Sequence, residues 1–193
     1  MLAYSSVAHA GYVLVAVRPG TLYGAGSVWL YLGAYTLTSL ITFGILQTLG
    51  RSGERDVTLD RVAGLAEEHP WLAFAMTVGL LSLMGFPGTF GFIGKWSLLN
   101  ASIADGERTL AVILVLTSVV SAGYYLPVIM SMYMRKSPAP GTYADARLGR
   151  PGAVVVGLAT VLVLLLGLWP REVVRYSDST ANDLRTVFSQ QGR

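Results

Sequence analysis

Long apolar runs limit what this chain can fold into more than any other feature of its sequence. Residues 152–169 carry no charged side chain, and residues 71–84 are almost uniformly apolar. A run of about 20 such residues is long enough to cross the roughly 30 Å hydrocarbon core of a bilayer as a helix. The whole chain is 53% hydrophobic and only 13% charged, with a mean hydropathy of +0.55. We therefore predict an all-α integral membrane protein.

Charged and proline-containing segments divide the chain into about five predicted transmembrane helices. We expect a helical bundle over residues 1–170 and a short extramembrane or interfacial tail over residues 171–193, where Leu184, Val187 and Phe188 have helical spacing. The first span is short for a full crossing, so the chain is expected to begin inside a helix, as a piece of a longer protein. The predicted spans are residues 2–17, 28–49, 71–104, 110–134 and 152–170.

The third span is predicted to be a discontinuous helix. Proline lacks an amide hydrogen and disfavours helical geometry at the preceding residue, and glycine allows dihedral angles that other residues resist. We expect one half-helix to end near Gly85 and a second to begin near Phe90. Irregular backbone at membrane depth persists only where it is buried in protein or lines a water-filled cavity, so such a break marks a candidate ion or substrate site. The predicted helix breakers are Gly85, Pro87, Gly88 and Gly91.

Lys95 is the only strongly basic or acidic side chain well inside a predicted span. A charged lysine at the centre of a membrane helix costs about 2.5 to 3.5 kcal/mol on insertion scales. Because of this cost, an ionisable residue in a membrane span is by default a candidate functional residue. The alternative is that the long side chain extends to the membrane interface. A buried lysine can alternate between its charged and neutral forms, which suits proton relay better than permanent anion binding.

His9 is the second candidate, on a predicted helix face with Ser5, Ser6 and Tyr12. Histidine titrates near neutrality and can pass a proton between its two ring nitrogens. A purely structural, hydrogen-bonded histidine is the equally weighted alternative. Further hydroxyl groups could extend a water-assisted path, and these are Tyr35, Tyr124 and Tyr125.

The remaining sequence features point away from covalent chemistry in this chain. It has no cysteine, and we find no phosphate-binding loop, metal-ligand cluster or nucleophile triad. The net charge of +3 would hint at nucleic acid in a soluble protein. Here the basic residues concentrate in residues 50–70 and 135–151, which we predict to be cytoplasmic loops, and we expect no nucleic-acid partner.

Two smaller expectations concern the loop of residues 50–70. Apolar side chains within it suggest a short amphipathic helix on the membrane surface. We expect His69 to be a solvated loop residue. The apolar side chains in question are Val57, Leu59, Val62 and Leu65.

Five segments together give the chain a family resemblance. They include Ala-Tyr-Ser-Ser-Val-Ala-His over residues 3–9 and Gly-Phe-Ile-Gly-Lys over residues 91–95, with further matches at residues 35–40, 63–73 and 118–126. The chain resembles the subunit N family of bacterial proton-pumping NADH-quinone oxidoreductase, respiratory complex I. The resemblance runs through most of residues 1–170, and it implies the C-terminal portion of an antiporter-like fold that contains two inverted repeats, each with a broken helix.

The resemblance also implies roles and partners. Lys95 would match the lysine of the outward proton path, and His9 a polar residue of the central hydrophilic axis. The chain itself would hold no cofactor. NADH, FMN, iron–sulfur clusters and quinone would belong to the complex, with other membrane subunits and the lipid bilayer as partners and the bacterial inner membrane as location.

The sequence departs from the family pattern at two points, and three other hypotheses compete with this interpretation. The family's upstream glutamate and lysines have no counterpart in this chain, and Pro127 stands where the family often has arginine. A subunit of a cation/proton antiporter or of a membrane-bound hydrogenase would share the broken helix and its lysine. The third hypothesis is a truncated structural subunit that only holds its neighbours together.

Overall fold

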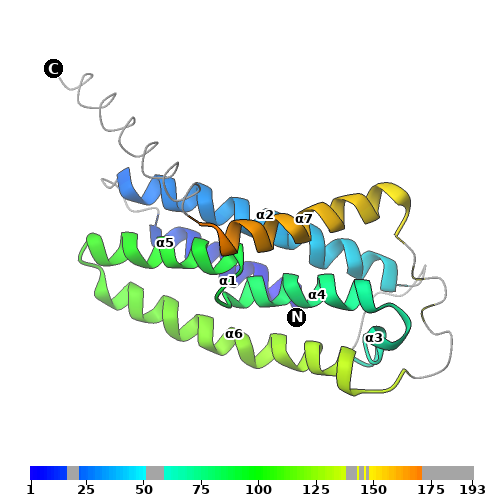
Figure 1. Ribbon diagram of the computed structural model, residues 1–193. Helices are drawn as coiled ribbons and strands as arrows, with labels where there is room; N and C mark the ends of the chain where they lie inside the picture. Colours follow the sequence, from blue (N-terminus) through cyan, green and yellow to red (C-terminus); the bar gives the residue numbers. More distant parts are fainter. Residues whose placement is uncertain (17–21, 51–58, 138–142, 144–145, 147, 171–193) are drawn as a thin grey trace.

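The computed structural model of the chain is a bundle of helices that run roughly along one long axis (Figure 1). The structure describes residues 1–16, 22–50, 59–137, 143, 146 and 148–170, and every regular element in these ranges is helical. The prediction of an all-α fold is confirmed. The elements are α1 (Leu2–Ala16), α2 (Leu22–Leu49), the 3-10 turn η1 (Leu59–Arg61), α3 (Leu65–Glu68), α4 (Pro70–Met84), α5 (Phe90–Ala104), α6 (Arg108–Met134) and α7 (Arg150–Leu168).

Three helices in the described ranges are long and apolar enough to cross a membrane, namely Gly26–Leu49 within α2, α6 and α7. Helices α4 and α5 have 15 residues each. At 1.5 Å per residue each is about 22 Å long, which is less than the hydrocarbon thickness of a bilayer. The two follow one another along the bundle (Figure 1), and α2 and α6 each pack against both. The prediction of one discontinuous helix is confirmed.

The break has a defined local cause. Gly85 takes a left-handed conformation with φ +86°. Its amide donates to the Ser82 carbonyl at 3.0 Å, and the Phe86 amide donates to the Leu81 carbonyl at 2.9 Å. This is the Schellman arrangement that ends a helix. Gly88 also has a positive φ, +90°, and helical geometry resumes at Phe90.

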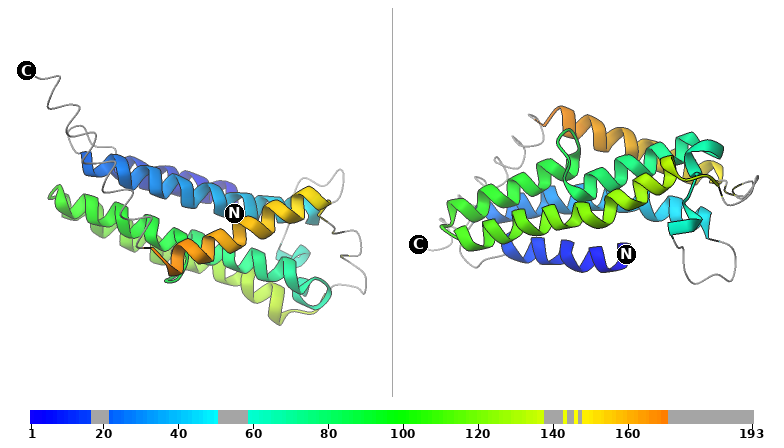
Figure 2. Two further views of the ribbon diagram at one scale, coloured as in Figure 1. Left: turned by 45° about the horizontal axis from the view of Figure 1, so that its top comes forward. Right: turned by 90° about the horizontal axis from the view of Figure 1, so that it is seen from below.

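The discontinuous helix lies at the centre of the bundle. Helices α1, α2, α6 and α7 all pack against α5, and α2, α6 and α7 pack against α4 (Figure 2). Gly167 of α7 lies so close to the break that a Cβ atom there would overlap the backbone of Gly88 and Thr89. The irregular segment is therefore covered by protein on the α7 side, as unpaired backbone at membrane depth requires.

Residues 59–69 lie together with residues 131–137, 143 and 146 at one end of the bundle. Arg135 and Asp60 form an ion pair at 2.9 Å, and the Gly64 amide donates to the Ser131 carbonyl at 3.1 Å. The Tyr143 hydroxyl lies 2.8 Å from the backbone carbonyls of both Arg61 and Ala63. The described parts of the two predicted basic loops thus lie side by side, which agrees with their assignment to one membrane side.

The structure corrects both smaller expectations for residues 50–70. In the described part, residues 59–69, the chain forms the short helical turns η1 and α3 rather than one amphipathic helix, and Val62 and Leu65 are buried in the protein core. Alternating apolar residues fit a protein neighbour as well as a lipid surface. His69 is half-buried, and its Nε2 atom donates to the Tyr143 carbonyl at 2.8 Å. Val57 and the apolar tail residues Leu184, Val187 and Phe188 lie outside the described residues.

Candidate functional site

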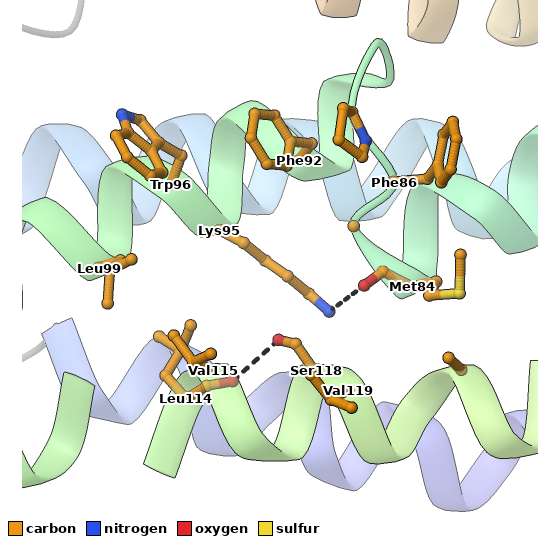
Figure 3. A pocket seen from close by; sticks show the side chains of 13 residues that line it. Met84, Phe86, Phe92, Lys95, Trp96, Leu99, Leu114, Val115, Ser118 and Val119 are labelled. Carbon is orange, nitrogen blue, oxygen red and sulfur yellow. Dashed lines mark hydrogen bonds between the residues drawn. The ribbon is translucent and has the colours of Figure 1, made fainter. Parts of the chain in front are cut away.

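Lys95 lies on the second turn of α5 with its side chain turned back toward the break (Figure 3). It is buried, with 6% of its surface exposed. The Nζ atom donates to the Met84 carbonyl at 3.0 Å. Met84 is the last residue of α4, and the carbonyl groups of a final helical turn have no partner within their own helix. The break therefore supplies the acceptor that the buried amine needs.

The hydrogen-bond acceptor of Lys95 Nζ, the Met84 backbone carbonyl, carries no charge. The ion pair of Arg135 with Asp60 belongs to the loop-rich end of the bundle. The amine also lies 4.9 Å from the centre of the Tyr12 ring, within the range of a cation–π contact. A carbonyl dipole and an aromatic face stabilise a cation less strongly than a carboxylate does.

A pocket of about 420 Å³ opens between the break and α6. Lys95 is the only ionisable side chain among its lining residues, and Ser118 of α6 is the only hydroxyl. Ser118 Oγ donates to the Leu114 carbonyl at 2.9 Å (Figure 3). The other lining residues are Met84, Gly85, Phe86, Pro87, Phe92, Trp96, Leu99, Leu114, Val115, Val119 and Ala122.

Hydrogen bonds outside this pocket connect the two halves of the discontinuous helix to each other and to α2. The Gly91 amide donates to Ser82 Oγ at 3.1 Å, across nine residues. Ser82 Oγ lies 2.9 Å from Thr38 Oγ1, which donates to the Ala34 carbonyl at 2.7 Å. A Cβ atom at residue 91 would overlap the Ser82 carbonyl. Glycine at this position permits the close approach of the two halves.

His9 occupies a second buried polar cluster, between α1, α2 and α6. Its Nδ1 atom is hydrogen-bonded to the Tyr31 hydroxyl, and its Nε2 atom lies 3.4 Å from the Tyr125 hydroxyl. The Tyr35 ring stacks on the imidazole with 4.9 Å between ring centres. His9, Tyr31 and Tyr125 are all buried. Both ring nitrogens therefore have hydroxyl partners, which a group that passes protons requires.

The remaining predicted tyrosine and a serine complete this cluster. Tyr125 is hydrogen-bonded to Ser5 Oγ, and the Tyr124 and Tyr125 rings lie 4.5 Å apart. Tyr12 joins the cluster to Lys95, since its ring centre lies 5.5 Å from that of His9. The structure thus gathers all the predicted relay and path residues into one region, alongside the four helix breakers.

Several members of this region escape prediction from the sequence. Tyr31 is not among the predicted relay and path residues, although it belongs with Tyr35 and Thr38 to the polar side chains of the second predicted span. The roles of Ser82 and of the Met84 carbonyl depend on tertiary contacts, and no local sequence pattern predicts them. Among the described residues no group of three or more His, Cys, Asp or Glu side chains is placed to hold a metal ion.

The chain is similar to curated bacterial subunits. It is 43% identical to NADH-quinone oxidoreductase subunit N of Gemmatimonas aurantiaca, over 100% of this chain and 38% of that protein. It is 45% identical to subunit N 1 of Sorangium cellulosum, over 88% of this chain and 34% of that protein. The chain therefore spans little more than a third of the length of these relatives.

Solved structures show the same fold. A chain of respiratory complex I from Thermus thermophilus with bound aureothin has a TM-score of 0.74 and 32% identity, over 90% of this chain and 38% of that one. A chain of the Mrp complex from Dietzia sp. DQ12-45-1b has a TM-score of 0.78 over 95% of this chain and 42% of that one, and its 22% identity supports the fold alone.

A family model supplies the assignment. Residues 1–121, which include α1, α2, both halves of the discontinuous helix and the Lys95 site, match the model described as NADH:quinone oxidoreductase/Mrp antiporter, TM. This match covers more than half of the chain. The chain belongs to the family of membrane subunits shared by NADH:quinone oxidoreductases and Mrp antiporters.

Proposed function

We propose that the chain is a proton-translocating part of the membrane subunit N of a bacterial NADH-quinone oxidoreductase, with Lys95 as its central relay group. The observation that carries this proposal is the buried Lys95 amine, held by the carbonyl that the helix break exposes. The identity of 43% to a curated subunit N supports the choice of complex.

The geometry supports a relay because the buried groups can exchange protons without a salt bridge to break. The Lys95 ammonium is stabilised by the Met84 carbonyl and the Tyr12 ring face. Removal of the proton leaves a neutral amine that the apolar walls of the pocket accommodate. His9, with hydroxyl partners at both nitrogens, is the second proton carrier in the proposal. Tyr35, Tyr124 and Tyr125 line the path near it.

The proposal places redox chemistry in other subunits. NADH, FMN, iron–sulfur clusters and quinone would be bound elsewhere in the complex, and this chain would contribute no cofactor. Its partners would be other membrane subunits, in the bacterial inner membrane. The basic loops of residues 50–70 and 135–151 would face the cytoplasm, with Lys95 in the outward half of the discontinuous helix.

A cation/proton antiporter subunit is the second candidate function, and a specific observation favours it. The family model that residues 1–121 match is described for Mrp antiporters as well as for NADH:quinone oxidoreductases. Sodium-dependent transport without NADH oxidation would favour the antiporter. A subunit of a membrane-bound hydrogenase would share the broken helix and its lysine, and a purely structural subunit would need neither.

The test is Lys95→Ala in the complete complex, reconstituted into vesicles. We expect the rate of proton pumping to fall by on the order of tenfold or more, because a positioned proton carrier accelerates proton transfer by at least this much. The number of protons pumped per NADH oxidised should fall as well. Lys136→Ala is the matched control, since Lys136 is exposed and lies outside the break. An unchanged proton-to-electron ratio in assembled Lys95→Ala complex would rule out the relay role and favour a purely structural subunit.

A further inference from the structure

Tyr12 lies between the two ionisable groups of the proposed relay. Its ring centre is 4.9 Å from Lys95 Nζ and 5.5 Å from the centre of the His9 ring. The ring also meets Tyr31 edge to face, with 6.3 Å between centres and an interplanar angle of 89°. Tyr12 comes from α1, Tyr31 from α2 and Lys95 from α5. Three separate helices thus meet at this one side chain.

The hydroxyl of Tyr12 is buried and has no hydrogen-bond partner in the described structure. Tyr12 is 5% exposed and packs with Tyr31, Leu98 and Leu114. A buried hydroxyl nearly always has a protein or water partner, because leaving it unpaired is costly. The hydroxyls of Tyr31 and Tyr125, by contrast, are both engaged in the His9 cluster. The Tyr12 hydroxyl is therefore the polar group at which an additional hydrogen-bonding ligand is expected.

We propose that Tyr12 is the junction of the relay, with its ring positioning the Lys95 amine and its hydroxyl holding an internal water molecule that connects Lys95 to the His9 cluster. This inference rests on the proposed function and deepens it. A water molecule suits the place because the Tyr12 hydroxyl has no protein partner in the described structure while its ring contacts Lys95, His9 and Tyr31. Internal waters need two to four polar partners.

The proton balance of this junction is simple. The Lys95 ammonium gives a proton to the water as the water gives one to the Tyr31 hydroxyl oxygen. Tyr31 in turn gives its own proton to His9 Nδ1, to which it is already hydrogen-bonded. The amine is left neutral, the imidazole becomes cationic, and water and tyrosine are unchanged. One positive charge has moved from α5 to α1, and the reverse sequence returns it.

Two substitutions separate the ring from the hydroxyl. Tyr12→Phe keeps the aromatic face beside Lys95 and removes the group that would bind water. Tyr12→Leu removes both. Tyr133→Phe is the matched control, because Tyr133 lies on α6 with 49% of its surface exposed, outside both clusters. Each variant is made in the complete complex and compared for assembly, NADH oxidation, proton-to-electron ratio and the pH dependence of pumping.

We expect Tyr12→Phe to assemble normally but to lower the pumping rate several-fold and to alter its pH profile. Tyr12→Leu is expected to lower it further, and Tyr133→Phe to match the parent. Electron cryomicroscopy of the parent at a resolution that shows ordered water should reveal density within hydrogen-bond distance of the Tyr12 hydroxyl. The same density should be lost in Tyr12→Phe.

Two results would overturn the junction. One is parental pumping and an unshifted pH profile in Tyr12→Phe. The other is a side chain, rather than water, bonded to the Tyr12 hydroxyl in the complete subunit. Lys95→Ala measured in parallel separates the two proposals: if it pumps normally, the relay itself is wrong, whereas a defect in Lys95→Ala with none in Tyr12→Phe removes only the junction. In both cases, the presence or absence of water density beside the Tyr12 hydroxyl shows whether Tyr12 binds a water molecule.

Discussion

The side-chain oxygen of Ser82 lies 3.1 Å from the amide nitrogen of Gly91 and so joins the last turn of α4 to the first turn of α5. First-turn amides of a helix have no acceptor within that helix. A serine on one half of the discontinuous helix therefore satisfies a donor on the other half. The same oxygen lies 2.9 Å from Thr38 of α2, so the joint is also attached to its neighbour.

Replacement of Ser82 tests this joint. Ser82→Ala should reduce the free energy of unfolding by about 1 to 3 kcal/mol, because it leaves a buried Gly91 amide without its acceptor. Thr38→Val removes the other partner of the same hydroxyl. Thermal unfolding of both single variants and the double variant gives the coupling, expected at about 0.5 kcal/mol or more for groups in one network. Strictly additive effects would show that the two contacts are independent.

Gly91→Ala should be disruptive for a different reason. The added methyl group would overlap the Ser82 carbonyl, and the backbone of α4 cannot move as a side chain can. We expect a loss of about 1 to 3 kcal/mol in stability, the usual range for overpacking, with displacement of Lys95 as a consequence. Gly123→Ala on α6 is the control, since nothing lies within 4 Å of its added Cβ. Equal melting temperatures for the two variants would contradict the close approach.

Tyr143→Phe probes the opposite, loop-rich end of the bundle. The Tyr143 hydroxyl donates to backbone carbonyls of the segment around Arg61 and Ala63, so its loss should increase hydrogen exchange in residues 59–69. We expect a loss of about 1 kcal/mol for the hydrogen bonding. Amide exchange read by mass spectrometry is the measurement, and unchanged exchange would show that other contacts hold the segment.

The same residue has a pH dependence of known sign. Burial, and next the nearby Glu68 carboxylate, raise the pKa of Tyr143 above its ordinary value of 10.0, with Arg61 acting in the opposite sense. The folded state therefore holds this proton more tightly than the unfolded state does. The contribution of Tyr143 to stability is complete below pH 10 and is lost as the pH rises through the folded-state pKa.

The break and its lysine are predictable from the sequence because both have local causes. Gly85 and Pro87 act on their own dihedral angles, and a lysine within an apolar run is visible without any knowledge of neighbours. The end of α4 at Met84 and the start of α5 at Phe90 agree with the predicted limits of the break.

The partners could not be predicted in the same way. The pairing of His9 with Tyr31 depends on how α1 and α2 are rotated about their axes, and α2 contains three tyrosines, of which the sequence does not say which one faces His9. The apolar side chains of Val62 and Leu65 predict a membrane-surface helix and are instead buried in protein, because an apolar face has the same pattern whether lipid or protein covers it. Tertiary packing determines both the rotation of the helices and whether protein or lipid covers an apolar face.

The neutral partner of Lys95 has an electrical consequence. Beside the uncharged Met84 carbonyl, the site carries one positive charge when Lys95 is protonated and none when it is not, whereas an ion pair would be neutral in its protonated form. Moving one elementary charge across the membrane is worth about 2.3 kcal/mol per 100 mV. If Lys95 is the relay group proposed above, its proton occupancy is expected to follow membrane voltage and any charge that a neighbouring subunit brings near.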